Sequence, residues 1–222
     1  IQRSAQSLRS LATGSHVTLS CSTAFAAYWM VPRMELFRAA LPDVDLRIQT
    51  SDRDLDLEGE GIPLGVRGGY PTDWPACQTE VLAPERIYPV CSAAHLDRFG
   101  PVDGPRDLLD LPLIHLEEPF RSATTWQDWF AAQGIAASSV PRGLQINDYV
   151  LVVQSVIEGQ GIALGWDHLI EGLVRKRVLA RLTGQVLATG KDFHVIWPRA
   201  VPLSQPAAKV RDWLLDQRTP SA

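Results

Sequence analysis

The clearest alternation of hydrophobic and polar positions lies in residues 20–42, directly after a short hydrophobic run at residues 17–19. Its hydrophobic positions recur with the spacing of one helix face: Met30, Met34, Phe37 and Leu41. Pro32 falls inside this pattern and interrupts helical hydrogen bonding. The pattern therefore predicts a strand, a turn, and a helix to Leu41 that either begins near Pro32 or kinks there.

The predicted turn is rich in hydroxyl groups, because it contains Ser20, Ser22 and Thr23. Hydroxyls in front of a helix commonly serve as plain N-caps. The same arrangement offers backbone N–H groups and the positive end of the helix dipole, which suit a small anionic or polar ligand. Both interpretations are open from the residues alone.

Strand and helix patterns alternate along the rest of the chain. The predicted strands cover residues 46–50, 62–67, 80–91 in two segments interrupted by Pro84, 111–116, 144–146, 161–166, 178–182 and 192–197. The predicted helices cover residues 52–60, 126–133, 149–158, 169–177 and 204–217. The strand at 46–50 is half polar, which is typical of a sheet edge. This alternation predicts an α/β architecture with largely parallel sheets.

Composition narrows the class of protein. A chain of 222 residues holds one large domain or two small ones, and 45% hydrophobic with 21% charged residues indicates a folded globular protein. The Gly- and Pro-rich residues 100–105 are the best candidate for a boundary. A net charge of −4 gives no general attraction to nucleic acid. If DNA is involved, we expect another part of the protein to contact it.

The cysteines and residues 1–14 indicate the cellular compartment in which the protein is expected. The three cysteines show no paired spacing, so we expect a reducing cytoplasm rather than a disulfide framework. Residues 1–14 contain arginines and no long apolar core, so they predict neither a signal peptide nor a membrane span. We interpret them as the end of a longer helix.

Catalytic and metal-binding motifs are not found. The five histidines include no i, i+4 pair and lie away from the cysteines, so no metal site is indicated. The GQGIALG segment at residues 159–165 departs from GxGxxG and opens a strand instead of a helix. No nucleophile, base and orienting group can be nominated together. We therefore expect neither an enzyme nor a cofactor.

Polar side chains stand instead at the C-terminal ends of the predicted strands. These residues are Ser20, Ser22, Thr23, Arg67, His115, Asn147, Asp148 and Trp166. In open α/β sheets, ligands bind outside those strand ends. The placement predicts a small-molecule site. For Arg67 two interpretations are open, a surface ion pair or a ligand clamp.

The ordered set of segments resembles a known family. The segments are VTLSCSTAFAAYWMVPRMELFRAALPDVDLRIQTSD, GIPLGVRGG, LPLIHL and NDYVLVVQSVIEGQGIALG. They resemble the effector-binding domain of LysR-type transcriptional regulators, in the branch of the glycine-cleavage activator and the β-lactamase regulators. The resemblance covers residues 17–215.

The resemblance implies a type 2 periplasmic-binding-protein-like fold of two Rossmann-like subdomains with a central cleft. Two crossover strands are expected near residues 87–91 and 193–197. The expected division places the end of a linker helix at 1–14, subdomain I at 15–90 plus 195–222, and subdomain II at 91–194.

The resemblance also implies where an effector binds. It places a small metabolite in the interdomain cleft, against the turn that contains Thr23 and against the helix start at Asn147, Asp148 and Tyr149. We expect Arg67 and the hydroxyl turn to hold a carboxylate or phosphate. His115, Tyr149 and Trp166 would supply shape and stacking.

At the level of the whole protein, the resemblance implies a cytoplasmic transcription regulator. Such a regulator forms a homodimer or tetramer through this domain, contacts DNA through an N-terminal domain outside this chain, and works with RNA polymerase, without a membrane. The alternative is a solute-binding protein of a transport system, which would share the fold.

Overall fold

The structure is a computed structural model that describes residues 16–100, 102–120, 123–136, 138 and 140–218. The chain separates into two compact units. The first holds residues up to Ala26, Met30–Pro84 and residues from Lys191 on, and the second holds Ala27–Trp29 and Glu85–Gly190. The linker helix expected at residues 1–14 lies outside the described residues.

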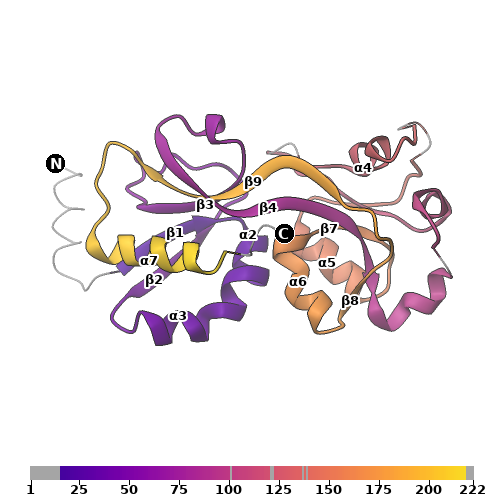
Figure 1. Cartoon of the computed structure of the whole chain (residues 1–222), viewed down its shortest axis with the longest axis horizontal. Coiled ribbons are helices and arrows are strands. Elements are labelled where there is room, and N and C mark those ends of the chain that lie inside the picture. The colour runs from indigo at the N-terminus through magenta and orange to yellow at the C-terminus, as the bar shows by residue number, and fades with distance from the viewer. Residues whose placement is uncertain (1–15, 101, 121–122, 137, 139, 219–222) are drawn as a thin grey trace. The chain divides into compact units, whose positions relative to one another are not determined.

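The first unit is built on a mixed sheet with the strand order β2-β1-β3-β9. These strands are β1 (His16–Cys21), β2 (Asp45–Thr50), β3 (Leu64–Gly69) and β9 (Leu187–Pro198). β1 pairs in parallel with β2 and β3, whereas β9 runs antiparallel to β3. β2 ends this order, so the predicted edge strand is confirmed. The C-terminal helix α7 (Gln205–Asp216) lies against β1 (Figure 1).

Pro32 divides the segment between β1 and β2 as predicted. The chain passes through a short α2 (Thr23–Phe25), a π-helical turn (Ala26–Met30), a 3-10 turn (Val31–Arg33) and α3 (Met34–Ala40). Met30 and Phe37 are buried, and the Phe37 ring meets Trp213 of α7 edge-on at 5.1 Å. Met34 and Leu41, predicted on the same face, are only partly buried.

The second unit contains two sets of strands. β4 (Cys77–Ser92) pairs antiparallel with β7 (Ala163–Trp166) and with β8 (Leu179–Arg181). β5 (Ile114–Leu116) and β6 (Leu144–Ile146) form a parallel pair. The helices of this unit are α4 (Trp126–Ala132), α5 (Tyr149–Ile157), α6 (Asp167–Arg175) and the 3-10 helices Ala93–Phe99 and Pro105–Asp110.

Two long strands each contribute residues to both units. β4 passes from the first unit to the second after Pro84, and β9 passes from the second to the first after Gly190. The predicted crossover strands are thus present. One short 3-10 helix, Pro71–Asp73, precedes β4 in the first unit. Within the described residues, no helix is long and apolar enough to span a membrane.

Three sequence predictions are wrong in detail. The helix expected at 52–60 is a series of turns, in which the Asp56 carboxylate accepts a hydrogen bond from the Gly59 amide at 3.0 Å. Pro84 does not divide β4, which is continuous, because a proline is tolerated in a strand where no ladder hydrogen bond needs its nitrogen. The sheets are mixed rather than largely parallel, since β4 and β9 make antiparallel pairs.

From the sequence, Asn147 or Asp148 is expected to cap α5, Gly159 to end it, and Val150, Val153, Val156 and Ile157 to form its buried face. Asp148 caps it, and Gly159 ends it with a φ of 71°, a conformation that favours glycine. Of the residues expected on the buried face, Val153 and Val156 are buried, whereas Val150 and Ile157 are only partly buried. The buried residues are Tyr149, Val152, Val153 and Val156.

Candidate functional site

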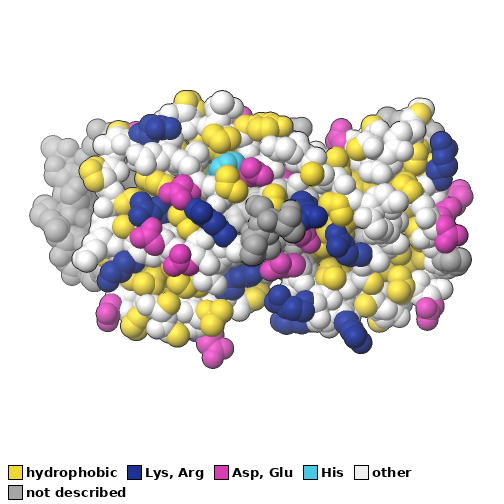
Figure 2. Space-filling model, in the orientation of Figure 1, with side chains coloured by type: hydrophobic (Ala, Val, Ile, Leu, Met, Phe, Trp, Pro, Cys, Tyr) yellow, Lys and Arg dark blue, Asp and Glu magenta, His cyan; other side chains and the backbone are white. Residues whose placement is uncertain are grey.

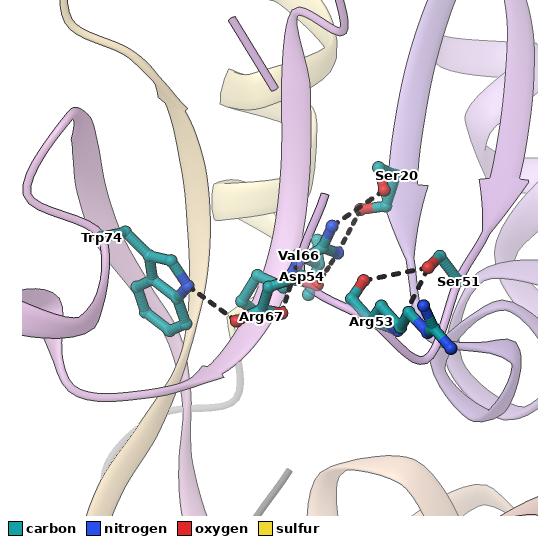
Figure 3. Close-up of polar contacts among 7 residues, drawn as sticks. All are labelled: Ser20, Ser51, Arg53, Asp54, Val66, Arg67 and Trp74. Atoms are coloured by element: carbon teal, nitrogen blue, oxygen red, sulfur yellow. Dashed lines mark hydrogen bonds and ion pairs between the residues drawn. The ribbon is translucent and has the colours of Figure 1, made fainter. Parts of the chain in front are cut away.

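In the first unit, Arg67 of β3 reaches the end of β1. Its Nη2 donates to the Ser20 hydroxyl at 2.9 Å, and its Nη1 donates to the Ser20 carbonyl at 3.1 Å and the Val66 carbonyl at 3.0 Å (Figure 3). The parallel pairing of β1 with β3 places Ser20 opposite Gly65, two residues before Arg67. The Arg67 side chain is 1% exposed. It is therefore a buried cation beneath the hydroxyl turn.

Asp54 compensates this buried charge. Its Oδ1 lies 3.0 Å from Arg67 Nε, and its Oδ2 accepts from the Trp74 indole nitrogen at 3.1 Å (Figure 3). Of the two interpretations of Arg67, the structure shows an ion pair, in which the guanidinium is buried and the Asp54 carboxylate is 44% exposed. The guanidinium makes four directed contacts, and these hold Ser20 and the 51–54 segment in place.

The three hydroxyls of the turn have different surroundings. Ser20 is buried against Arg67, and Ser22 is the N-cap of α2, where its hydroxyl accepts from the Phe25 amide at 3.1 Å. Among the described residues, no group hydrogen-bonds the hydroxyl of Thr23, which is half-buried. Thr23 is therefore the hydroxyl of this turn that is available to a ligand.

The second unit contains a cavity of about 150 Å³ between β5, β6, β7 and the start of α4. Two of the predicted site residues, His115 and Trp166, line it. Its other polar lining residues come from the same four elements and the loops beside them: Glu117, Thr124, Thr125, Gln127 and Gln145. We call this space the β5 cavity.

His115 presents a neutral ring to its surroundings. Burial lowers its pKa, while a hydrogen bond to the Pro141 carbonyl and the charge of Glu117 act in the opposite direction. Within the described part of the chain, its Nε2 atom is buried and lacks a hydrogen-bond partner. A buried polar atom without a partner is uncommon in a folded protein and often marks a place where a ligand or water binds.

Trp166 is held by two neighbours. Its indole nitrogen donates to Glu85 Oε2 at 3.1 Å, and Glu85 Oε1 accepts from the Thr189 hydroxyl at 2.8 Å. Its backbone amide donates to the Tyr149 hydroxyl at 3.1 Å, and the two rings meet edge-on at 5.0 Å. Tyr149 is buried, which raises the pKa of its hydroxyl. The Tyr149 hydroxyl therefore supports β7.

The start of α5 is closed by its own side chains. Asp148 Oδ1 accepts from the amides of Val150 at 2.7 Å and Leu151 at 3.1 Å, while Asn147 is exposed. Tyr28, which belongs to the second unit, donates its hydroxyl to the Val150 carbonyl at 3.1 Å. Burial and the charge of Asp148 raise the pKa of Tyr28 to about 12, so its hydroxyl keeps its proton.

The sequence matches the family described as the LysR substrate binding domain over residues 12–219. The chain belongs to this family. Its sequence is 29% identical, over 90% of this chain and 64% of the relative, to the glycine cleavage system transcriptional activator of Escherichia coli K12. It is also 29% identical, over 88% of this chain and 64% of the relative, to the transcriptional activator AmpR of Rhodobacter capsulatus.

Solved LysR structures share the fold. The effector domain of AmpR from Pseudomonas aeruginosa matches with a TM-score of 0.74 at 21% identity, over 91% of this chain and 95% of that one. The regulatory domain of CrgA from Neisseria meningitidis matches with a TM-score of 0.76 at 16% identity, over 93% and 100%. The type 2 periplasmic-binding-protein-like fold expected from the sequence is thus confirmed.

The match to the LysR family bears on the choice between a transcription regulator, a solute-binding protein and an enzyme. The chain belongs to the LysR substrate binding domain family, and the relatives named above are transcription activators by name. The comparisons do not favour the solute-binding alternative. The chain spans 64% of the length of these curated relatives. Within the described residues, no group of three or more His, Cys, Asp or Glu could hold a metal ion.

Five residues around the predicted positions were missed by the sequence reasoning. They are Tyr28, Asp54, Trp74, Glu85 and Thr189. Trp74 lies seven residues after Arg67 and Asp54 lies thirteen before it, so no local motif joins them. The acidic residues in the 51–60 segment could have pointed to Asp54 as a partner of Arg67, because a buried arginine needs a carboxylate. Nothing in the sequence pointed to Glu85.

Proposed function

We propose that this chain is the sensing half of a cytoplasmic transcription regulator and that it binds a small metabolite. The observation that carries the proposal is the LysR match over residues 12–219, in a chain whose second unit holds a cavity lined by the predicted His115 and Trp166. The domain division at 15–90 plus 195–222 and at 91–194 belongs to the same proposal.

The effector contacts differ in kind between the two units. In the first unit, Thr23 offers a hydroxyl to the ligand, while Ser20, Ser22 and Arg67 hold the turn that carries it. In the second unit, His115 and Trp166 contact the ligand, and Tyr149 and Asp148 hold β7 and α5. Asn147 is exposed and available at the start of α5.

The full-length protein, in this proposal, binds DNA through a domain outside residues 1–222 and forms a homodimer or tetramer through this domain. The net charge of −4 supports the first point. So does the face drawn in Figure 2, where acidic and basic side chains are interspersed rather than gathered into one basic surface. Effector binding shifts the balance between conformations of the regulator, which then changes its contact with DNA and RNA polymerase.

Thermal unfolding against a panel of metabolites tests the sensing role. The panel contains amino acids, dipeptides, cell-wall fragments and small organic acids. A ligand present at about 100 times its Kd stabilises the folded state by about 2.7 kcal/mol. We expect at least one compound to raise Tm, and Thr23→Val to reduce that rise.

Thr18→Val is the matched control, since Thr18 lies on β1 among the residues of a separate surface groove. A panel that leaves Tm unchanged throughout would contradict the sensing role for these metabolite classes. A rise that Thr23→Val leaves intact would remove Thr23 from the site while keeping the sensing role.

A further inference from the structure

We propose that the β5 cavity receives an ammonium group, so that the effector is an amine-bearing metabolite of amino-acid or short-peptide size. This inference rests on the proposed function and adds the chemical class of the ligand. It follows from the charge, the hydrogen-bonding groups and the size of the cavity.

The lining carries one charged side chain, the carboxylate of the exposed residue Glu117. Its twelve residues include no Lys or Arg. A carboxylate ligand in this cavity would meet Glu117 without a cationic side chain to compensate it. An ammonium group would gain a favourable charge interaction with Glu117, strengthened by hydrogen bonding.

The neutral groups that line the β5 cavity also favour a ligand that donates hydrogen bonds. The Pro141 carbonyl accepts a hydrogen bond from the His115 ring. The ring nitrogen that makes this bond must carry a proton, because a carbonyl oxygen cannot donate. Because the ring carries one proton when neutral, Nε2, which lacks a partner among the described residues, bears the lone pair. Gln145 and Thr124 add an amide and a hydroxyl oxygen to the same lining. An ammonium has three N–H bonds to donate to such acceptors.

The start of α4 could favour an anion instead, because helix N-termini carry positive charge. That end is already occupied by Asp128. Its Oδ2 accepts from the Thr125 amide at 2.8 Å and from the Thr125 hydroxyl at 2.7 Å, and its own amide donates to Thr125 Oγ1 at 3.2 Å. This closed capping box supplies the negative charge that an anionic ligand would otherwise bring.

The volume of the β5 cavity and its tryptophan side chains also suit an ammonium group. A volume of about 150 Å³ is that of an engineered cavity that holds benzene, so the β5 cavity has room for a group of about six non-hydrogen atoms. Trp126 and Trp166 stand in its wall. Indole rings are the side chains that attract a cation most strongly through their faces. The cavity therefore suits the amino end of a small metabolite.

Compounds that differ in one group test the inference. The probes are alanine, valine and alanyl-alanine, each compared with its deaminated analogue: propionate, isovalerate and propionyl-alanine. Binding is measured by calorimetry and by the NMR shift of the Trp166 indole N–H. We expect an amine to bind and to shift that resonance, and its deaminated analogue to bind at least tenfold more weakly.

Glu117→Gln is the decisive variant, and we expect it to weaken amine binding tenfold or more. Glu158→Gln makes the same change in net charge at an exposed position of the second unit and should stay within twofold. If Glu117→Gln fails to fold, Gln145→Met removes a different acceptor from the lining and should also weaken binding.

The outcomes separate the two proposals. Deaminated analogues that bind as well as the amines, or amine binding that Glu117→Gln leaves unchanged, would overturn the ammonium assignment and leave the sensing role intact. Binding by organic acids alone in the broader panel would do the same. If no compound of either set binds, both proposals fail.

Discussion

At the scale of single residues, Arg67 is the side chain whose environment is most demanding. It is 1% exposed, and its charge is met by Asp54 and by three oxygen atoms of Ser20 and Val66. The buried guanidinium would lose its compensating charge if Asp54 were removed, whereas the Asp54 carboxylate is 44% exposed and is also solvated by water. The burial of Arg67 therefore depends on its contacts with Asp54 and Ser20.

We predict that Arg67→Ala lowers the free energy of unfolding by about 1 to 3 kcal/mol, because the Ser20 oxygens lose a buried donor, whereas the exposed Asp54 carboxylate is solvated by water. Urea unfolding measures the change. Arg47→Ala, on the exposed face of the edge strand β2, should alter stability by no more than about 0.5 kcal/mol. Equal, small effects of the two substitutions would contradict a structural role for the buried Arg67 guanidinium.

The histidines make a prediction about pH. Burial lowers the pKa of both His115 and His194, with nearby carboxylates opposing the shift. The unfolded chain titrates at the ordinary pKa of 6.5, so below that pH it binds protons that the folded state does not. Stability is thus complete above pH 6.5 and is lost as the pH falls through the lowered folded-state pKa values.

Measurements of Tm from pH 8 to pH 5 check this sign. We expect Tm to fall below pH 6.5, and to fall less in His194→Asn, which removes one of the two groups. His16→Asn, at an exposed position, should follow the parent protein. A Tm that rises as the pH drops from 6.5 to 5 would show that the two pKa values are not lowered in the folded state.

At the scale of elements, Glu85 joins three strands. It stands on β4, accepts from Trp166 at the end of β7, and accepts from Thr189 on β9. β4 and β9 are also the two strands that pass from one unit to the other. One carboxylate thus fixes the Trp166 ring in the wall of the β5 cavity and joins the neighbouring strands.

We predict that Glu85→Ala destabilises the fold by about 2 to 4 kcal/mol, because the buried Trp166 indole and the partly buried Thr189 hydroxyl lose a charged acceptor. Glu85→Gln, which keeps one acceptor and the shape, should cost less. Glu80→Ala on the same strand removes an exposed ion pair with Arg218 and should cost about 1 kcal/mol or less. Urea unfolding of the three variants gives the ranking, and a Glu80 effect equal to that of Glu85→Ala would contradict it.

At the scale of the whole molecule, we predict that the proposed dimer involves exposed apolar residues of the 3-10 turn and α3. Val31 and Leu36 are each 59% exposed beside the 3-10 turn and α3, and β2 ends the strand order of the described sheet. An open edge strand next to exposed hydrophobic side chains is a common site of association.

We predict that Leu36→Asp shifts the protein toward the monomer without lowering Tm at low protein concentration, because Leu36 is exposed within its own chain. Sedimentation velocity across a concentration series measures the shift. Val201→Asp places the same charge at another exposed apolar residue, 52% exposed, and should leave association unchanged. Dimers that persist in Leu36→Asp would place the interface elsewhere.

The sequence alone determined the local structure and the family. The hydroxyl turn, the break at Pro32, a cap of α5 at Asn147 or Asp148 and the end of α5 at Gly159 follow from short-range rules that a few neighbouring residues express. The ordered segments identified the LysR resemblance because together they span most of the chain. These features need no knowledge of how distant strands pair.

Only the tertiary structure decided what the polar residues do. Arg67 was expected at a surface or against a ligand, and strand pairing buried it on Ser20 and Asp54 instead. Glu85 and Trp166 are separated by 81 residues, so their contact exists only once β4 and β7 are paired. Burial and long-range pairing fix the energy of a charged group, and both depend on segments far apart in the chain.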